Sequence, residues 1–345
     1  MSSAPLAITQ GDPAGIGGEI IAKAFRDHAS DLAGCFVAGE LAHLRRAAAA
    51  AAPDGVPLPI AVIDSPEQLA DVPPRCIPLL RTSADVPLRP WGQADAAAGR
   101  IAADAVSWAA RAALRGEIAG LVTAPLNKEA LSAAGLPYPG HTELLQAEAA
   151  VHAGVPVERL PVRMMLANDE LRTVLVSIHV SLRDALAAVT RGNVLQTLRI
   201  THASLARLLG RPPRIGVAGL NPHAGEGGLF GREEIETIAP AIEAARNEGI
   251  EASGPYAPDT VFMRARSTPQ RAGEFDVVVA MYHDQGLIPV KYLGVEQGVN
   301  VTLGLPLVRT SPDHGTAFDI AGTGRADASS LVAAVRMARR LSAAA

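Results

Sequence analysis

The sequence predicts an α/β protein with two domains and mostly parallel sheets. Short apolar runs typical of buried strands alternate along the 345 residues with Ala-rich stretches of helical spacing. Polar segments punctuated by glycine follow many of these runs, as at the carboxyl edge of an open parallel sheet. The chain is 48% hydrophobic and 19% charged, which suffices for a buried core in two domains or one large α/β unit.

The first part of the chain alternates strand and helix signals. Strands are predicted over residues 6–9, 35–39, 58–64 and 119–123. Helices are predicted after the glycine-rich turn to about Arg26, over 41–52 and over 95–115. The Pro-rich segment 65–90 is interpreted as a surface excursion.

The second part continues the alternation. Residues 162–167 and 173–178 are predicted as two strands joined by a turn at Asn168-Asp169. Further strands are predicted over 215–220 and 275–280, and helices over 182–209, 233–247 and 329–341. No internal repeat of fixed period is found.

Composition argues against several classes of protein. A formal net charge of −4 and the lack of a Lys/Arg block argue against nucleic-acid binding. The two cysteines, Cys35 and Cys76, are expected to be reduced buried thiols. No apolar run is long enough to cross a bilayer, and no secretory signal is recognised, so a soluble cytoplasmic protein without membrane partners is expected.

Three histidines stand at the carboxyl ends of predicted strands, namely His179, His223 and His283. Because such ends meet at the ligand-binding edge, these imidazoles predict a divalent metal site with positions left open for a substrate. Imidazole suits Zn²⁺, Co²⁺, Ni²⁺ or Mn²⁺ better than Mg²⁺. Asp284, beside His283, is predicted to orient a metal-binding histidine without contacting the metal itself. The other helical histidines are expected at the surface: His28, His43, His152 and His202.

A second group of residues predicts capture of an anion. Lys291, Asn300 and Arg309 follow His283 within apolar, glycine-punctuated sequence. His141 and Thr142 begin a predicted helix, whose amino end favours a phosphate or carboxylate. The alternative for Thr142 is a helix cap.

Two glycine-rich segments are candidates for a nucleotide. Residues 11–19 lack the dinucleotide fingerprint and are interpreted as a tight strand-to-helix turn that lines a cleft. Residues 314–322 also lack that fingerprint, but they are similar to the loop by which isocitrate and isopropylmalate dehydrogenases hold their nucleotide. That similarity assigns His314, Gly315, Thr316 and Ala317 to cofactor binding.

Taken in order, the punctuated segments resemble the PdxA family, whose founding activity is 4-hydroxythreonine-4-phosphate dehydrogenase of vitamin B6 synthesis. The matching segments cover nearly the whole chain: GDPAGIG (11–17), TAPLNK (123–128), GHTE (140–143), GLNPHAGE (219–226), YHDQG (282–286), GVNVTLGLP (298–306) and RTSPDHGTA (309–317).

The resemblance implies a homodimer of the isocitrate/isopropylmalate dehydrogenase-like fold with the active site in an interdomain cleft. It implies domains of 1–135 plus 302–345 on the cofactor side and 136–301 on the metal and dimer side. Three histidines would bind Zn²⁺, Co²⁺, Mn²⁺ or Mg²⁺, with His179 shared across the dimer interface. NAD or NADP would accept the hydride, and the β-keto acid formed would decarboxylate. The substrate contacts implied are His141, Thr142, Lys291, Asn300 and Arg309.

Several alternatives stay open at this point. The general base is Asp284, Lys291 or Lys128. Gly18 replaces the family's usual Pro, and several segments lean towards relatives that oxidise 4-phospho-D-threonate or 4-phospho-D-erythronate; a further relative oxidises the cis-dihydrodiol of terephthalate. We place 4-hydroxy-L-threonine 4-phosphate first. The alternatives from other classes are a three-His zinc hydrolase and a non-catalytic metabolite-binding protein.

Overall fold

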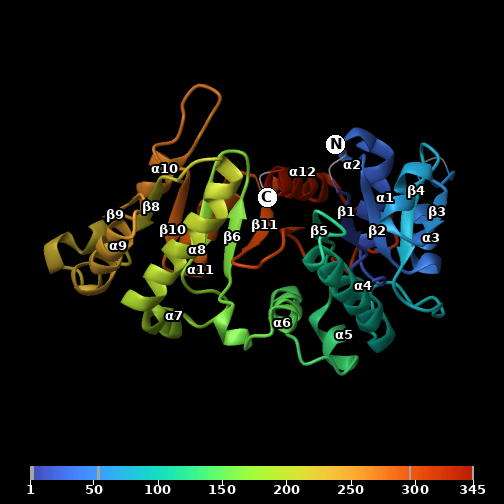
Figure 1. Cartoon of the computed structure of the whole chain (residues 1–345), viewed down its shortest axis with the longest axis horizontal. Coiled ribbons are helices and arrows are strands. Elements are labelled where there is room, and N and C mark those ends of the chain that lie inside the picture. The colour runs from blue at the N-terminus through green and yellow to red at the C-terminus, as the bar shows by residue number, and fades with distance from the viewer. Residues whose placement is uncertain (1–3, 53–54, 295–296, 344–345) are drawn as a thin grey trace. The chain divides into compact units, whose positions relative to one another are not determined.

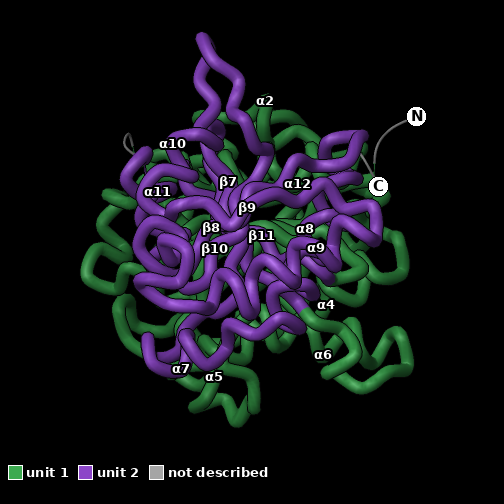
Figure 2. The backbone as a smooth tube through the Cα atoms, turned by 90° about the vertical axis from the view of Figure 1, so that its left-hand side faces the viewer, with its two compact units in different colours: residues 1–161, 305–343 green, residues 162–304, 344–345 purple. Residues whose placement is uncertain are grey.

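The computed structural model describes residues 4–52, 55–294 and 297–343, and these form two compact units (Figure 2). Unit 1 comprises residues 1–161 and 305–343, and unit 2 comprises residues 162–304. Residues 136–161 therefore lie in unit 1, whereas the sequence-based division placed them in the second domain. The reason is that the helix they contain packs against a long helix of unit 1.

Unit 1 contains a parallel sheet of six strands (Figure 1). Their order across the sheet is β3 (Ile60–Ile63), β4 (Ile77–Arg81), β2 (Cys35–Gly39), β1 (Leu6–Thr9), β5 (Gly120–Thr123) and β12 (Arg309–Pro312). In β1 every residue is buried, and Thr9 is in register with Ala38 and Thr123. The carboxyl ends of β1, β2 and β5 therefore lie side by side at the same edge of the sheet.

The helices of unit 1 pack around this sheet. They are α1 (Gly17–Asp27), α2 (Ala29–Leu32), α3 (Leu41–Ala50), α4 (Ala96–Leu114), α5 (Lys128–Ala133), α6 (His141–Ala153) and α12 (Ser329–Ala343), with 3₁₀ turns at Pro66–Asp71 and Val157–Arg159. α4 packs on β1, β2 and β5 and contacts α5 and α6, and α12 packs on β5 and β12. Asp95 begins α4 by accepting hydrogen bonds from the amides of Ala97 and Ala98.

The interpretation of residues 65–90 as a surface excursion is wrong in part. The segment contains β4, a largely buried strand that pairs with both β3 and β2. Pro78 lies within β4, and because proline lacks an amide hydrogen it marks a sequence as an edge strand or a loop. Because of Pro78, the sequence around Ile77–Leu80 does not read as a buried strand.

Unit 2 contains the other six strands, in the order β11 (Val299–Leu303), β6 (Arg163–Ala167), β7 (Arg172–Leu175), β10 (Val277–Ala280), β8 (Ile215–Ala218) and β9 (Ala252–Tyr256). β6 pairs antiparallel with β11 and β7, and the remaining pairs are parallel. The turn predicted at Asn168 is confirmed, since its side-chain oxygen accepts from the amides of Glu170 and Leu171. The predicted mostly parallel α/β class is thus confirmed.

The helices of unit 2 differ from the predicted ones in detail. They are α7 (Leu182–Ala188), α8 (Arg191–Leu209), the 3₁₀ segment Pro222–Gly228, a π turn (Glu234–Ile238), α9 (Ala239–Asn247), α10 (Val261–Ala265) and α11 (His283–Tyr292). The helix predicted over 182–209 is interrupted because Thr190 caps α8 by accepting from the amide of Asn193. Buried Leu175, Phe275, Val278 and Leu287 belong to the core of this unit. In the described ranges no helix is both long and apolar enough to span a membrane.

Candidate active site

Arg309 is a buried cation of unit 1. It opens β12 and is 4% exposed, and its Nε and Nη2 donate to the Thr123 hydroxyl at the end of β5 at 3.1 and 2.8 Å. Burial lowers the pKa of the Arg309 guanidinium to about 10, so the group keeps its charge at neutral pH. Because a guanidinium is a planar set of N–H donors that matches a carboxylate or a phosphate, Arg309 is suited to bind an anion.

His141, the first residue of α6, presents a hydrogen-bond acceptor in the same region. Burial and the nearby Arg309 lower the pKa of His141 well below its usual value. A hydrogen bond with the Ala124 backbone raises this pKa, but its effect is smaller. Its Nε2 is buried and has no hydrogen-bond partner among the described residues. A neutral ring whose Nδ1 donates to a carbonyl leaves Nε2 as an acceptor. The capping alternative for Thr142 is wrong, because the cap position is Gly140 and no side chain caps α6.

The two glycine-rich segments of unit 1 contact each other. The Ile16 amide donates to the Thr316 carbonyl at 3.0 Å, and a Cβ on Gly15 would lie 2.9 Å from the Thr316 side chain. The buried carboxylate of Glu19 accepts from the amides of Gly322 and Gly324. Residues 314–324 are therefore held in place by the turn that begins α1.

A cavity of about 520 Å³ lies against this contact. Gly315 and Thr316, two of the predicted cofactor residues, line it together with Lys128, and the other lining residues are Gly92, Ala94, Leu126, Asn127, Glu129 and Phe318. A cavity of this size is typical of small-molecule and cofactor sites. Lys128 is the cation among these residues and therefore faces whatever occupies the cavity.

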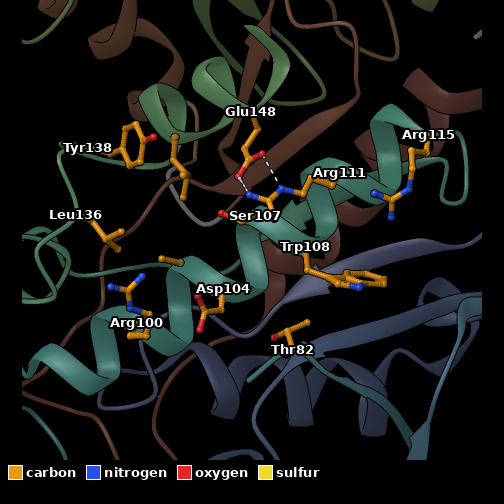
Figure 3. A pocket seen from close by; sticks show the side chains of 12 residues that line it. Thr82, Arg100, Asp104, Ser107, Trp108, Arg111, Arg115, Leu136, Tyr138 and Glu148 are labelled. Carbon is orange, nitrogen blue, oxygen red and sulfur yellow. Dashed lines mark hydrogen bonds and ion pairs between the residues drawn. The ribbon is translucent and has the colours of Figure 1, made fainter. Parts of the chain in front are cut away.

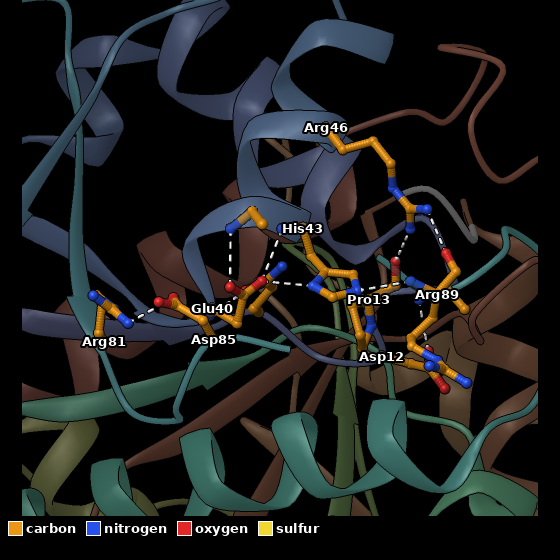
Figure 4. Close-up of polar contacts among 11 residues, drawn as sticks. Asp12, Pro13, Glu40, His43, Arg46, Arg81, Asp85 and Arg89 are labelled. Atoms are coloured by element: carbon orange, nitrogen blue, oxygen red, sulfur yellow. Dashed lines mark hydrogen bonds and ion pairs between the residues drawn. The ribbon is translucent and has the colours of Figure 1, made fainter. Parts of the chain in front are cut away.

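A network of polar side chains contacts the glycine-rich turn that precedes α1 (Figure 4). Arg46 donates to the carbonyl of Pro13 at 3.0 Å and to that of Arg89, and its guanidinium lies 3.8 Å from the centre of the Trp91 ring. Nδ1 of His43 is hydrogen-bonded to the Glu40 carboxylate, and its Nε2 accepts a hydrogen bond from the Arg89 amide. His43 is 1% exposed, so the expectation that it lies at the surface is wrong.

Asp12 is a buried carboxylate in this turn. One of its oxygens accepts from the Ala14 amide at 2.8 Å, and the other is buried without a partner in the described chain. Burial, with the charge of Asp95 adding to it, raises the pKa of Asp12 to about 6.

The Asp12 carboxylate is therefore expected to destabilise the protein at neutral pH. A carboxyl with a raised folded-state pKa loses stability as pH rises from about 4 to about 6, because the unfolded chain ionises first. We expect the D12N variant to be about 2–3 kcal/mol more stable than the parent at pH 7.5, with the gain vanishing near pH 4. Urea unfolding at both pH values measures this, and D64N at an exposed position is the matched control. Equal gains at the two pH values would contradict the assignment.

In unit 2, the carboxyl ends of three strands are tied together by two side chains. Gln285 accepts from the Met281 amide at 2.7 Å and donates to the Gly219 carbonyl at 2.8 Å. Ser177 donates to the Met281 carbonyl at 2.9 Å. The segments that carry His179, His223 and His283 are thus anchored to one another close to the sheet.

Two of the three predicted metal ligands come together. The rings of His179 and His283 have centroids 5.6 Å apart. Two imidazoles bound to one tetrahedral zinc through bonds of about 2.0–2.1 Å have centroids roughly 5 Å apart, so this pair fits a shared ion. Asp284 Oδ1 lies 2.7 Å from Nδ1 of His283, which leaves Nε2 for the metal. His283 is also the first residue of α11.

His223 lies on the segment that follows β8. Its Nδ1 is 3.0 Å from Glu226 Oε2, its ring packs edge-on against Phe230, and its side chain is 66% exposed. The buried Glu234 holds the segment by accepting from the amides of Leu220 and Asn221, both at 2.7 Å. Among the residues described in a single chain, no group of three or more His, Cys, Asp or Glu side chains is placed to hold a metal.

The candidate bases occupy three different places. Asp284 is engaged with His283. Lys291 is in the last turn of α11, which places it roughly 12 Å along the helix axis from His283. Lys128 lines the cavity of unit 1. Asn300 lies in the antiparallel strand β11 opposite Leu166. The structure thus does not gather Asp284, Lys291 and Lys128 around one point within either unit.

Left-handed backbone marks the same segments. In the described ranges, the non-glycine residues with positive φ are Arg75, His179, His223, Ala224, Glu226 and Ala317. All of them except Arg75 lie in the segments that carry predicted site residues. Such conformations cost roughly 1–3 kcal/mol each and cluster at functional sites. Sequence reasoning missed the residues that support these segments, namely Glu19, Gln285 and Glu234.

Comparison with known proteins agrees with the motifs. Residues 31–338 match the family described as "Pyridoxal phosphate biosynthetic protein PdxA". This chain belongs to the PdxA family. It is 52% identical to a 4-hydroxythreonine-4-phosphate dehydrogenase of Beijerinckia indica over 98% of this chain and 95% of that protein. It is 44% identical to a D-threonate 4-phosphate dehydrogenase of Salmonella typhimurium over 99% and 100%.

A solved PdxA structure has the same fold. The crystal structure of a 4-hydroxythreonine-4-phosphate dehydrogenase from Klebsiella pneumoniae matches 99% of this chain and 100% of its own, with a TM-score of 0.85 and 42% identity. The predictions of PdxA membership and of an enzyme of the dehydrogenase class are thus confirmed.

Proposed function

We propose that this PdxA-family enzyme oxidises a hydroxyl group of a small phosphorylated hydroxy acid with NAD or NADP and a divalent metal. The substrate we place first is 4-hydroxy-L-threonine 4-phosphate, whose oxidation product, a β-keto acid, loses its carboxylate. The observation that carries the proposal is the His179–His283 pair with Asp284 behind it, in a chain whose relatives are named dehydrogenases. D-Threonate 4-phosphate is the second candidate, because a relative of that name is 44% identical.

The metal is held by the imidazoles of His179, His223 and His283. When bound, a divalent ion supplies Lewis-acid chemistry that lowers the pKa of a hydroxyl and polarises the ketone, and NAD(P) supplies the hydride acceptor. Asp284 acts as a positioning residue, because its carboxylate fixes the tautomer and orientation of His283. Lys291 and Asn300 remain predicted substrate contacts.

Arg309 and His141 bind the anionic part of the substrate. The buried guanidinium offers paired donors, and the neutral His141 accepts a hydrogen bond from a hydroxyl, an ammonium or a protonated phosphate oxygen beside it. Discrimination between the two substrates then falls on groups that read the second carbon, which carries an amino group in one substrate and a hydroxyl in the other.

The cofactor occupies the cavity lined by Gly315 and Thr316, with His314 and Ala317 beside it. Lys128 lines this cavity and would bind a phosphate of the cofactor there, which favours a binding role for Lys128 over that of the general base. The cavity's backbone wall depends on the close contact between Gly15 and Thr316.

A side chain at position 15 is expected to weaken cofactor binding. In G15A the new Cβ would lie 2.9 Å from the Thr316 side chain and carbonyl, so residues 314–317 must shift. We expect the Kd for NAD(P), measured by equilibrium dialysis, to rise about tenfold, as a displacement worth roughly 1.4 kcal/mol would produce. The control is G192A in α8, where an added Cβ meets nothing within 4 Å. An unchanged Kd in G15A would argue against this cavity as the cofactor site.

The proposed homodimer brings the third histidine. Exposed large apolar side chains follow each metal-site histidine of unit 2 within ten residues of the sequence: Val180 and Leu182 after His179, Leu229 and Phe230 after His223, and Ile288 and Tyr292 after His283. Monomers rarely expose so many large apolar side chains close to a polar site, so a second copy is expected to cover them.

Subunit mixing decides which histidine comes from the partner. If His179 is the one shared across the interface, as the family resemblance implies, H179A and H283A subunits complement each other, because one site of a mixed dimer then has all its ligands. If His179 and His283 of one chain act together, as their 5.6 Å contact suggests, that mixture stays inactive.

The control for mixing is the H179A and H223A pair. In the second arrangement this pair regains activity, whereas H179A with H283A does not. Activity in neither mixture, although the mixed dimers form, would refute a metal site shared between subunits. The relatives are named dehydrogenases, which argues against the zinc hydrolase alternative.

A further inference from the structure

We propose that unit 1 carries a second ligand site on α4, separate from the residues assigned above, which binds an amino-substituted aromatic ring bearing a phosphate. The site is a cavity of about 570 Å³ (Figure 3). This volume lies within the range of small-molecule sites. It is lined by Thr82, Arg100, Ala103, Asp104, Ser107, Trp108, Arg111, Arg115, Leu136, Tyr138, Leu144 and Glu148.

The α4 residues of the cavity lie on one face of the helix. Arg100, Asp104, Ser107, Arg111 and Arg115 follow one another at spacings of three or four, which places their side chains in a row. The row carries three guanidinium groups and one carboxylate. Guanidinium groups beside a cavity suit a phosphate ligand, because arginine donates several hydrogen bonds to phosphate oxygens.

The arginines differ in how far they are neutralised. Arg111 is held by Glu148 of α6 through two hydrogen bonds of 2.8 and 2.9 Å, and Arg115 pairs with Glu117. Arg100 donates to the Ala134 carbonyl at 3.2 Å, and no carboxylate of the described chain forms an ion pair with it. Arg100 is therefore the cation available to an anion, and the paired Arg111 supplies a fixed second guanidinium.

Trp108 provides an aromatic surface for a ring. Its indole packs edge-on against the buried Phe36, with centroids 5.8 Å apart and an angle of 81° between the planes. This contact braces the ring from the core, while another part of the indole lines the cavity. Tyr138 adds a second aromatic wall. A planar ring is the group that gains most from such surfaces.

Two polar groups near Trp108 lack donors. Burial raises the pKa of Asp104, and no hydrogen bond to its carboxylate is found within the described ranges. The Thr82 hydroxyl is buried without a partner among the same residues. An unpartnered acceptor beside an aromatic surface selects a ring that carries an N–H donor. A purine with an exocyclic amine and a 5′-phosphate, such as AMP, meets all of these requirements.

Tryptophan fluorescence tests the site directly, because the chain has two tryptophans. In W91F, Trp108 is the remaining reporter, and we expect saturable quenching by AMP but much weaker quenching by adenosine, which lacks the phosphate. Purine riboside 5′-monophosphate, which lacks the amine, is expected to bind about tenfold more weakly. W108F reports instead from Trp91, which packs on Gly322 next to the proposed cofactor cavity.

Matched variants complete the test. R100A is expected to raise the Kd for AMP about tenfold, whereas R159A, at an exposed arginine of unit 1, leaves it unchanged. D104A, which removes the acceptor oxygens, should abolish the preference for the amine. Equilibrium dialysis of AMP with wild-type enzyme under saturating NAD replaces fluorescence if W91F fails to fold. Absence of saturable binding in both measurements would overturn the proposal, and none of these outcomes depends on catalysis.

Discussion

The R309M variant is expected to lose kcat/KM by about 100- to 1,000-fold, mainly through a higher KM. Arg309 is a buried cation that donates to Thr123, and it is proposed to bind the anionic part of the substrate. Truncating one partner of a buried charged pair costs about 2–5 kcal/mol, and 1.4 kcal/mol corresponds to tenfold. Steady-state kinetics with the metal-loaded enzyme, and substrate binding followed by calorimetry, measure the loss.

Arg163 offers a control for loss of a half-buried guanidinium. It lies in β6 and donates to Thr197 and Gln196, neither of which is assigned to the substrate. R163M is expected to lower the free energy of unfolding while leaving KM unchanged. A similar rise in KM in both variants would show that the R309M effect is structural.

Loss of His283 is expected to abolish metal binding at the site. H283A removes one of the two imidazoles whose rings lie 5.6 Å apart, so the affinity for Zn²⁺ or Co²⁺ should fall by more than about 100-fold. The D284N variant keeps the ligand but weakens its orientation, and we expect a loss of about 10- to 100-fold in metal affinity. The absorption spectrum of the Co²⁺-loaded protein reports both effects without reference to turnover.

An exposed histidine in α6, His152, provides the control for these variants. H152A should bind metal as the parent does. If H283A retains the cobalt spectrum of wild type, His283 is not a ligand, and the metal site must be sought elsewhere.

Most of the fold could be predicted because hydrophobic periodicity determines it. The strands at residues 6–9, 35–39 and 215–218 are continuous apolar runs, and their positions were recovered closely. β4 is not predicted because Pro78 lies within it. The predicted boundary after residue 135 differs from that of the compact units because the packing of α6 on α4 has no local signal in the sequence. Contacts between distant segments decide such features.

The candidate site was predicted in its parts and less well in its assembly. The His179–His283 pair and the contact of Gly15 with Thr316 join residues named from sequence. The buried side chains that hold them in place were not foreseen, since Glu19, Gln285 and Glu234 act on backbone groups far along the chain. His43 was taken for a surface residue because nothing in its helix reveals the partner Arg89.

The most direct test of the proposed reaction is NAD(P)H production by the metal-loaded enzyme. The substrates to offer in parallel are 4-hydroxy-L-threonine 4-phosphate, 4-phospho-D-threonate, 4-phospho-D-erythronate and the cis-dihydrodiol of terephthalate. We predict turnover of a phosphorylated substrate, with 4-hydroxy-L-threonine 4-phosphate the best, and loss of that turnover when a chelator removes the metal. Full activity in the presence of the chelator, or failure to bind NAD or NADP at all, would contradict the proposal.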